Sequence, residues 1–240
     1  MMADTFEDGI ALYNQKNYKD ALAVFLSLPS DSGIPPLELS YYAGLSYARL
    51  NRFDEALMYL EQVVTASSDV KRIHQCRLTL AVLYTKTDRP RLADYELQKL
   101  IEDGYETAEV YCSMAYIAWE LDRKDEAVRH YETALSLKPE CSTALNGLGY
   151  VLACIGKDLT KALSYCKKAV DKNPDSPAFL DSLGWVYYQL GLNKEAMTYI
   201  KRANSLLPGN SEISEHYEIL ISNGNAVREN NRISEHEGTV

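Results

Sequence analysis

The side chains that could do chemistry are few and widely spaced in this sequence. The histidines are His74, His130, His216 and His236. None has a partner at the spacing of a zinc site or of a Ser-His-Asp triad. The motifs G-x-x-x-x-G-K-[ST], G-x-G-x-x-G, G-x-S-x-G and H-E-x-x-H do not occur, so phosphate cradles, nucleophile elbows and metalloprotease sites have no support. We therefore expect no enzymatic activity, no catalytic residue, no metal and no cofactor.

Cysteines and paired acids offer no alternative site. The cysteines are Cys76, Cys112, Cys141, Cys154 and Cys166. They are odd in number and never in C-x-x-C spacing, which favours reduced thiols in the core over disulfides or zinc. Asp54-Glu55 and Asp125-Glu126 stand before expected helices, where the helix dipole favours acids as N-caps or first-turn residues.

Composition excludes several classes of partner. The formal net charge is −9, from 34 acidic and 25 basic residues, which argues against binding to phosphate backbones or anionic lipid. There is no run of 18 apolar residues, and the sequence begins without the basic and apolar regions of a secretory signal. We expect a cytoplasmic protein that neither binds nucleic acid nor inserts into a membrane.

The elements that must carry any site are helices in pairs. Leu180, Leu183, Gly184 and Tyr187 follow the i, i+3, i+4, i+7 pattern of one helix face. After Gly191 the residues Ala196, Ile200 and Ala203 form a second such face, and Pro177 and Pro208 bound the whole unit. The pattern predicts a helical hairpin.

The hairpin pattern recurs along the chain with a period near 34 residues. The two units upstream repeat it at Leu145, Leu148, Gly149, Leu152, Gly156, Ala162, Cys166, Ala169 and Pro174, and at Tyr111, Met114, Ala115, Ala118, Ala127, Tyr131, Ala134 and Pro139. Further upstream the pattern is weaker but keeps its phase. These residues resemble the tetratricopeptide repeat, a family with small residues where two helices cross and a closing proline. The resemblance implies an all-α, right-handed superhelical solenoid of antiparallel helix hairpins.

We place six units in residues 2–210, at about 2–35, 37–70, 74–107, 108–141, 142–176 and 177–210. An insertion near Lys71-Arg72-Ile73 separates the second and third units. The fifth unit has one residue more than the sixth between its helices, which should distort the turn or add a bulge. Residues 211–221 are amphipathic and should form a capping helix, and residues 222–240 have no periodic apolar face, so we expect a disordered tail.

The crossing of the two helices in a unit requires small side chains. Gly184 and Ala196 stand at such a crossing, where a bulky residue would keep the helices apart. A Gly184→Leu change should overpack it, at a cost of about 1–3 kcal/mol.

A hairpin array without catalytic chemistry is most simply a surface for other chains, and the resemblance implies use of the concave face. That face lies opposite the packing residues of each first helix. The candidate groove residues are Tyr41, Arg49, Tyr116, Trp119, Glu120, Asn146, Tyr150, Asp181, Trp185 and Tyr188. The same offsets give Phe6, Tyr13, Leu78, Lys86, Glu109 and Cys112. The aromatic residues either contact a ligand or pack between neighbouring first helices.

The expected function is a scaffold or adaptor that binds a peptide or helix through an aromatic-rich concave groove. Rigid rings contribute contact area at low entropic cost, and acidic residues among them favour an apolar or basic partner. The alternative is a cytoplasmic chaperone that holds a secretion substrate or an aggregation-prone segment. A clamp for the C-terminal carboxylate of a chaperone lacks its residues. Phe6 and Ile10 stand where the first unit would need Lys and Asn, and Asn146, Arg49 and Lys86 belong to different units. Partner identity and oligomeric state stay open.

Overall fold

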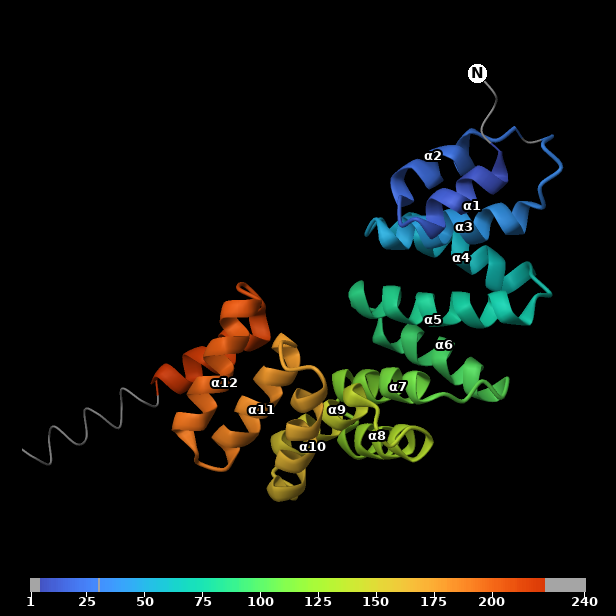
Figure 1. The fold of residues 1–240 in the computed structure, drawn as a ribbon. Coiled ribbons are helices and arrows are strands. Elements are labelled where there is room, and N and C mark those ends of the chain that lie inside the picture. Colours follow the sequence, from blue (N-terminus) through green and yellow to red (C-terminus); the bar gives the residue numbers. More distant parts are fainter. Residues whose placement is uncertain (1–4, 30, 223–240) are drawn as a thin grey trace, which may run out of the picture. The chain divides into compact units, whose positions relative to one another are not determined.

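The computed structural model describes residues 5–29 and 31–222, and within these ranges every regular element is a helix. The all-α fold of helical hairpins that the sequence predicts is confirmed. The chain divides into two compact units, Met1–Glu106 and Thr107–Val240, which we describe separately (Figure 1).

Unit 1 contains three antiparallel hairpins. Its helices are α1 (Phe6–Asn14), α2 (Tyr18–Ser27), α3 (Pro36–Arg49), α4 (Phe53–Ala66), α5 (Val70–Lys86) and α6 (Pro90–Glu102). Each helix packs against the next one along the chain, and α3 also packs against α5. The first helices of neighbouring hairpins therefore lie side by side.

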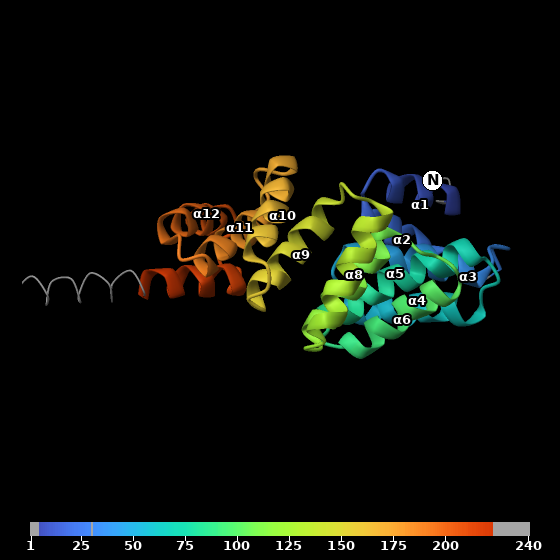
Figure 2. The same ribbon diagram turned by 90° about the horizontal axis from the view of Figure 1, so that it is seen from below.

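Unit 2 repeats this arrangement and adds one helix. It contains α7 (Ala108–Glu120), α8 (Lys124–Leu137), α9 (Ser142–Cys154), α10 (Leu159–Lys172), α11 (Pro177–Gln189) and α12 (Asn193–Leu206). Here α9 contacts both α7 and α11. Residues 211–222 form a further helix, drawn in red in Figure 2, which we call the C-terminal helix. Its Ile213 packs with Leu180 of α11 and Ala203 of α12.

The turns inside the hairpins share one backbone feature. A residue with positive φ follows the first helix, such as Asn51 (φ 57°), Asp88 (φ 57°) or Asp122 (φ 57°). The left-handed region ends a helix and is tolerated best by Gly, Asn and Asp. In the fifth hairpin Gly156 and Asp158 both have positive φ, so the extra residue predicted there is absorbed by a second left-handed position.

The predicted insertion near Lys71-Arg72-Ile73 lengthens a helix. Helix α5 has 17 residues, against 14 in α3 and 13 in α7. Asp69 caps its N-terminus and accepts hydrogen bonds from the backbone nitrogens of Lys71 and Arg72. The added turn places Arg72 beside Glu38 of α3, with the guanidinium 2.6 Å from the carboxylate.

The small residues allow the predicted close approach of paired helices. A Cβ on Gly184 would lie 2.5 Å from Cγ1 of Ile200 and 3.1 Å from its backbone nitrogen. A Cβ on Gly149 would lie 2.5 Å from the Cys166 sulfur and 2.9 Å from the Ala162 carbonyl oxygen. Any side chain at these positions must displace the second helix.

The five cysteines are free, and all but Cys154 are buried. Burial raises the pKa of Cys166 to about 12, which keeps this thiol protonated at neutral pH. The sulfur atoms of Cys112 and Cys141 lie 3.9 Å apart, too far for a disulfide bond. These thiols fill the core as small apolar groups.

Residues 211–222 are helical, at the place where the sequence predicts a capping helix (211–221). Of the expected tail at 222–240, residues 223–240 lie outside the described part of the chain. Helix α8 ends at Leu137 and α9 begins at Ser142, and the six unit boundaries stay a prediction.

Candidate functional site

The candidate residues lie on the first helices of the hairpins, α3, α7, α9 and α11. Equivalent positions in different first helices can be compared by their distance in sequence from the small crossing residue, such as Gly44 in α3 or Gly184 in α11. One residue after it, unit 1 has Leu45 and Val82, and unit 2 has Tyr116, Tyr150 and Trp185. The position five residues later is Arg49 and Lys86 in unit 1, and Glu120, Cys154 and Gln189 in unit 2. The same face is therefore aliphatic and basic in unit 1 but aromatic with acidic groups in unit 2.

Side chains bridge neighbouring first helices at a separation of about one repeat. The Tyr41 hydroxyl donates to Oε1 of Gln75 over 2.5 Å, at a separation of 34 positions. Nδ2 of Asn146 donates to the Ser182 hydroxyl over 3.0 Å, at a separation of 36 positions. These contacts hold the first helices in register.

The aromatic residues of unit 2 form a row across α7, α9 and α11. Trp119 meets Tyr150 edge to face, with ring centroids 6.1 Å apart. The ring centroids of Trp185 and Tyr188 lie 4.9 Å apart. All four side chains are half-buried. Packing between first helices and partial exposure thus occur together at these residues.

The C-terminal helix lies against this aromatic row. The Tyr150 hydroxyl donates to Oε1 of Glu212 over 2.7 Å, and the imidazole of His216 stacks on Trp185 with centroids 4.0 Å apart and planes 17° apart. Burial raises the pKa of Tyr150, and the nearby Cys154 and Glu212 raise it further. Tyr150 therefore stays protonated and remains a hydrogen-bond donor.

Asp181 is the most deeply buried acid of this face. It is 4% exposed and His216 is 6% exposed, and Nδ1 of His216 lies 2.8 Å from Oδ2 of Asp181. Among the described residues, the other carboxylate oxygen of Asp181 and Oδ1 of Asn146 are buried without a hydrogen-bond partner.

The remaining candidates of unit 2 are more open. Tyr116 is 47% exposed, and Glu120 at the end of α7 is exposed as well. Burial of the Tyr116 phenol raises its pKa, with further contributions from Glu120 and Glu212. Tyr116 and Glu120 are the candidates whose substitution disturbs the core least.

In unit 1 the two candidates differ in their exposure to solvent. Tyr41 is 7% exposed and lies under Arg72, whose guanidinium carbon is 5.4 Å from the ring centroid. Burial raises the pKa of Tyr41 to about 12. Tyr41 therefore packs between α3 and α5, whereas Arg49 is exposed.

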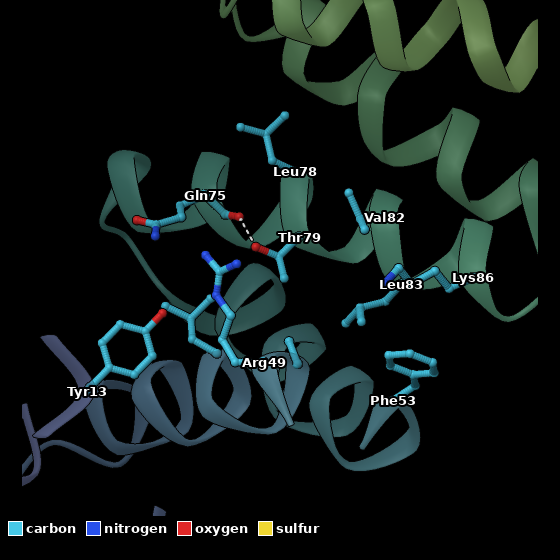
Figure 3. A pocket seen from close by; sticks show the side chains of 11 residues that line it. Tyr13, Arg49, Phe53, Gln75, Leu78, Thr79, Val82, Leu83 and Lys86 are labelled. Carbon is cyan, nitrogen blue, oxygen red and sulfur yellow. Dashed lines mark hydrogen bonds between the residues drawn. The ribbon is translucent and has the colours of Figure 1, made fainter. Parts of the chain in front are cut away.

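Arg49 lines a pocket of about 310 Å³ on the first-helix face of unit 1 (Figure 3). The lining residues are Tyr13, Leu45, Ala48, Arg49, Phe53, Gln75, Leu78, Thr79, Val82, Leu83 and Lys86. Figure 3 shows Arg49 reaching from α3 toward α5, and Lys86 lies with its nitrogen 5.6 Å from the ring centroid of Phe53. The structure therefore brings together two basic residues that the sequence placed in separate repeats.

Sequence reasoning missed Glu212 and His216 as parts of the unit 2 face, and Phe53 and Gln75 as parts of the unit 1 pocket. A usable signal existed for His216, because it stands 35 positions after Asp181. Complementary polar residues one repeat apart on first helices are candidates for direct contact. No comparable pattern marks Phe53, which comes from a second helix.

Stacked helical hairpins with an exposed first-helix face define a helical-repeat protein. A tetratricopeptide repeat profile matches residues 6–71 and 112–177, and a second such profile matches residues 178–210. These matches cover more than half of the chain, so the chain belongs to the tetratricopeptide repeat family. Such repeats form a protein–protein interaction scaffold.

One similar protein is named for the same repeat, and two similar solved structures share the fold. A TPR repeat-containing protein of Pseudomonas aeruginosa is 26% identical over 211 residues, which are 88% of this chain and 35% of that protein. The chain thus spans about a third of that relative. The crystal structure of the APC/C hetero-tetramer Cut9-Hcn1 is 15% identical with a TM-score of 0.71, over 90% of this chain and 42% of that one. The crystal structure of MamA protein is 23% identical with a TM-score of 0.57, over 71% and 91% of the two chains. At these identities the two structures support the fold alone.

The described residues contain neither a candidate metal site nor a candidate membrane span. Within residues 5–29 and 31–222, no group of three or more His, Cys, Asp or Glu side chains is placed to hold a metal ion. In the same ranges, no helix is long and apolar enough to cross a membrane.

Proposed function

We propose that this chain is a non-catalytic adaptor that binds a peptide or helix of a protein partner on the first-helix face of unit 2. The observation that carries the proposal is the C-terminal helix, which already lies on this face through Tyr150, Asp181 and Trp185. Beside this helix the face leaves Tyr116 and Glu120 exposed, an aromatic anchor and an acid that a partner helix can contact.

The chemistry of the face supports an apolar or basic partner. Glu120, Asp181 and Glu212 supply negative charge around the aromatic row, and Glu120 and Glu212 are exposed. A partner lysine or arginine can pair with the carboxylates of Glu120 and Glu212. Cytoplasmic location and the absence of nucleic-acid binding stay predictions.

The test changes the two open groove residues together. A Tyr116→Ala, Glu120→Lys variant should lose the proteins that the wild-type chain captures from a cell extract, while its thermal unfolding midpoint stays close to wild type. Both side chains are exposed, so their loss leaves the core intact.

The matched control is Glu132→Lys, a charge reversal at an exposed position of the second helix α8. If Glu132→Lys and the groove variant capture the same proteins in the same amounts, the groove is not the binding face. An aggregation assay separates the adaptor from the chaperone alternative, because only a chaperone should keep an unfolded client in solution.

A further inference from the structure

The pocket of unit 1 differs in charge from the unit 2 face and stands apart from the function proposed above. Its lining contains two cations, Arg49 and Lys86, and no aspartate or glutamate. This is unusual for a chain whose net charge is −9. We propose that this pocket is a second docking site, which binds an internal peptide segment with an acidic side chain next to an apolar one.

Arg49 is available to a ligand. It is exposed, and among the described residues none forms a hydrogen bond or an ion pair with its guanidinium. Its neighbour Arg52, by contrast, pairs with Glu55. The planar guanidinium can donate two parallel hydrogen bonds to one carboxylate, so Arg49 is the specific contact in the proposed site.

Lys86 supplies a second positive charge on α5. Its nitrogen lies 5.6 Å from the ring centroid of Phe53, and within residues 5–29 and 31–222 no side chain forms an ion pair with it. Arg49 and Lys86 come from neighbouring first helices, so a segment that crosses α3 and α5 can meet both.

The wall between the two cations is apolar. Leu45 and Leu83 form its buried part, and Val82 is 51% exposed. When a ligand covers such an exposed apolar side chain, the free energy of binding becomes more favourable by about 25 cal/mol per Å² of apolar surface removed from water. The combination of cations and aliphatic surface explains why the ligand needs both an acidic and an apolar side chain.

The size of the pocket limits what it binds. A volume of about 310 Å³ is at the low end of ligand sites, which run from about 300 to 1,000 Å³. Two exposed cations are also too few for a phosphate backbone, whose binding needs several neutralised charges. A short peptide segment, bound weakly and reversibly, fits both the volume and the charge.

The experiment selects ligands without bias. A display library of random 12-residue peptides, with constant residues on both sides of the random segment, is selected for binding to the full chain. The enriched sequences are then synthesised as C-terminally amidated peptides, and their affinity is measured by calorimetry. We expect enrichment of Asp or Glu beside Leu, Ile, Val or Phe. The Arg49→Gln, Lys86→Gln variant should bind these peptides at least tenfold more weakly than wild type.

Matched controls separate this site from other surfaces. Lys71→Gln, Arg91→Gln removes the same charge from exposed positions of unit 1 outside the pocket and should bind like wild type. Val82→Asp places an acid in the pocket and should abolish binding, whereas Val82→Ile should retain it. The unit 2 variant Tyr116→Ala, Glu120→Lys should bind the selected peptides normally, so failure here and failure of the unit 2 groove are distinguishable.

The proposal would be overturned if the selected peptides are not enriched in Asp or Glu. It would also be overturned if the Arg49→Gln, Lys86→Gln variant or the Val82→Asp variant binds the selected peptides as tightly as wild type. Binding that requires a free C-terminal carboxylate, tested with non-amidated copies of the peptides, would also overturn it, because the pocket would then recognise a chain end.

Discussion

Gly184 shows how strongly one residue depends on the approach of two helices. Helix propensity alone favours alanine over glycine inside a helix by about 1 kcal/mol. A Cβ at this position, however, would lie 2.5 Å from the fully buried Ile200. The close approach and the intrinsic propensity therefore act in opposite directions.

We predict that Gly184→Ala lowers the free energy of unfolding by about 1–2 kcal/mol, because the overpacking cost exceeds the gain in propensity. Urea denaturation followed by circular dichroism measures this change. The control is Ser164→Ala, at an exposed position of α10, which should be neutral or slightly stabilising. A stable Gly184→Ala variant would show that α11 and α12 separate without cost.

The polar residues Asp181 and His216 also depend on the contact between two helices. Each is buried, and each has the other as its partner at 2.8 Å. Removal of one leaves the other desolvated and unpaired, which costs more than an exposed pair contributes. Charge reversal at Asp181 is therefore a poor probe of partner binding, although the sequence alone makes it an obvious choice.

At the scale of elements, the C-terminal helix is both a cap and a cover. Ile213 and Leu220 are 3% exposed and close the apolar end of the hairpin array, as a terminal element of a solenoid must. Glu212 and His216 on the same helix contact the aromatic row. One helix therefore closes the end of the array with its apolar residues and contacts the aromatic row with its polar residues.

We predict that a chain ended at Asn210 exposes Trp185. The stacked imidazole of His216 would be absent, so acrylamide should quench Trp185 fluorescence more strongly than in the full chain. The burial lost with Ile213 and Leu220, about 1.5–3 kcal/mol for each, should also lower the thermal unfolding midpoint.

The measurement needs each tryptophan by itself. Trp119→Phe leaves only Trp185 to report, and Trp185→Phe leaves only Trp119, which makes its ring contact with Tyr150 rather than with His216. Quenching of Trp119 should change less. Equal quenching of Trp185 in the long and short chains would contradict the covering role of the helix.

At the scale of the molecule, the chain consists of two compact units. Each unit contains three hairpins with their own stacking of first and second helices. In repeat proteins stability is roughly a sum of repeat and neighbour contributions, so a division that respects the compact units should preserve most of these contributions.

We predict that fragments 1–106 and 107–240 each fold and unfold cooperatively, and that their circular dichroism spectra add up to that of the full chain. A cut after Lys138, between α8 and α9, is the control. It separates Tyr131 from Gly147, which pack closely across that junction, and should give less stable, aggregating fragments. Unfolded 1–106 or 107–240 fragments would show that the two units depend on each other.

The sequence by itself determined the hairpins. Apolar spacing of 3.6 residues, small residues such as Gly149 and Gly184, and turn residues such as Asn51 act within one repeat, so their pattern predicts the helices and their pairing. The positions of both insertions could also be predicted, but not that the first becomes an extra turn of α5.

Only the tertiary structure decided which side chains of the first-helix face remain open. Tyr41 is covered by residues one repeat away, Trp185 is covered by the C-terminal helix, and Arg49 shares an open pocket with Lys86. The physical reason is that periodicity assigns a residue to a face, whereas its accessibility depends on the side chains that neighbouring helices, distant in sequence, place against it.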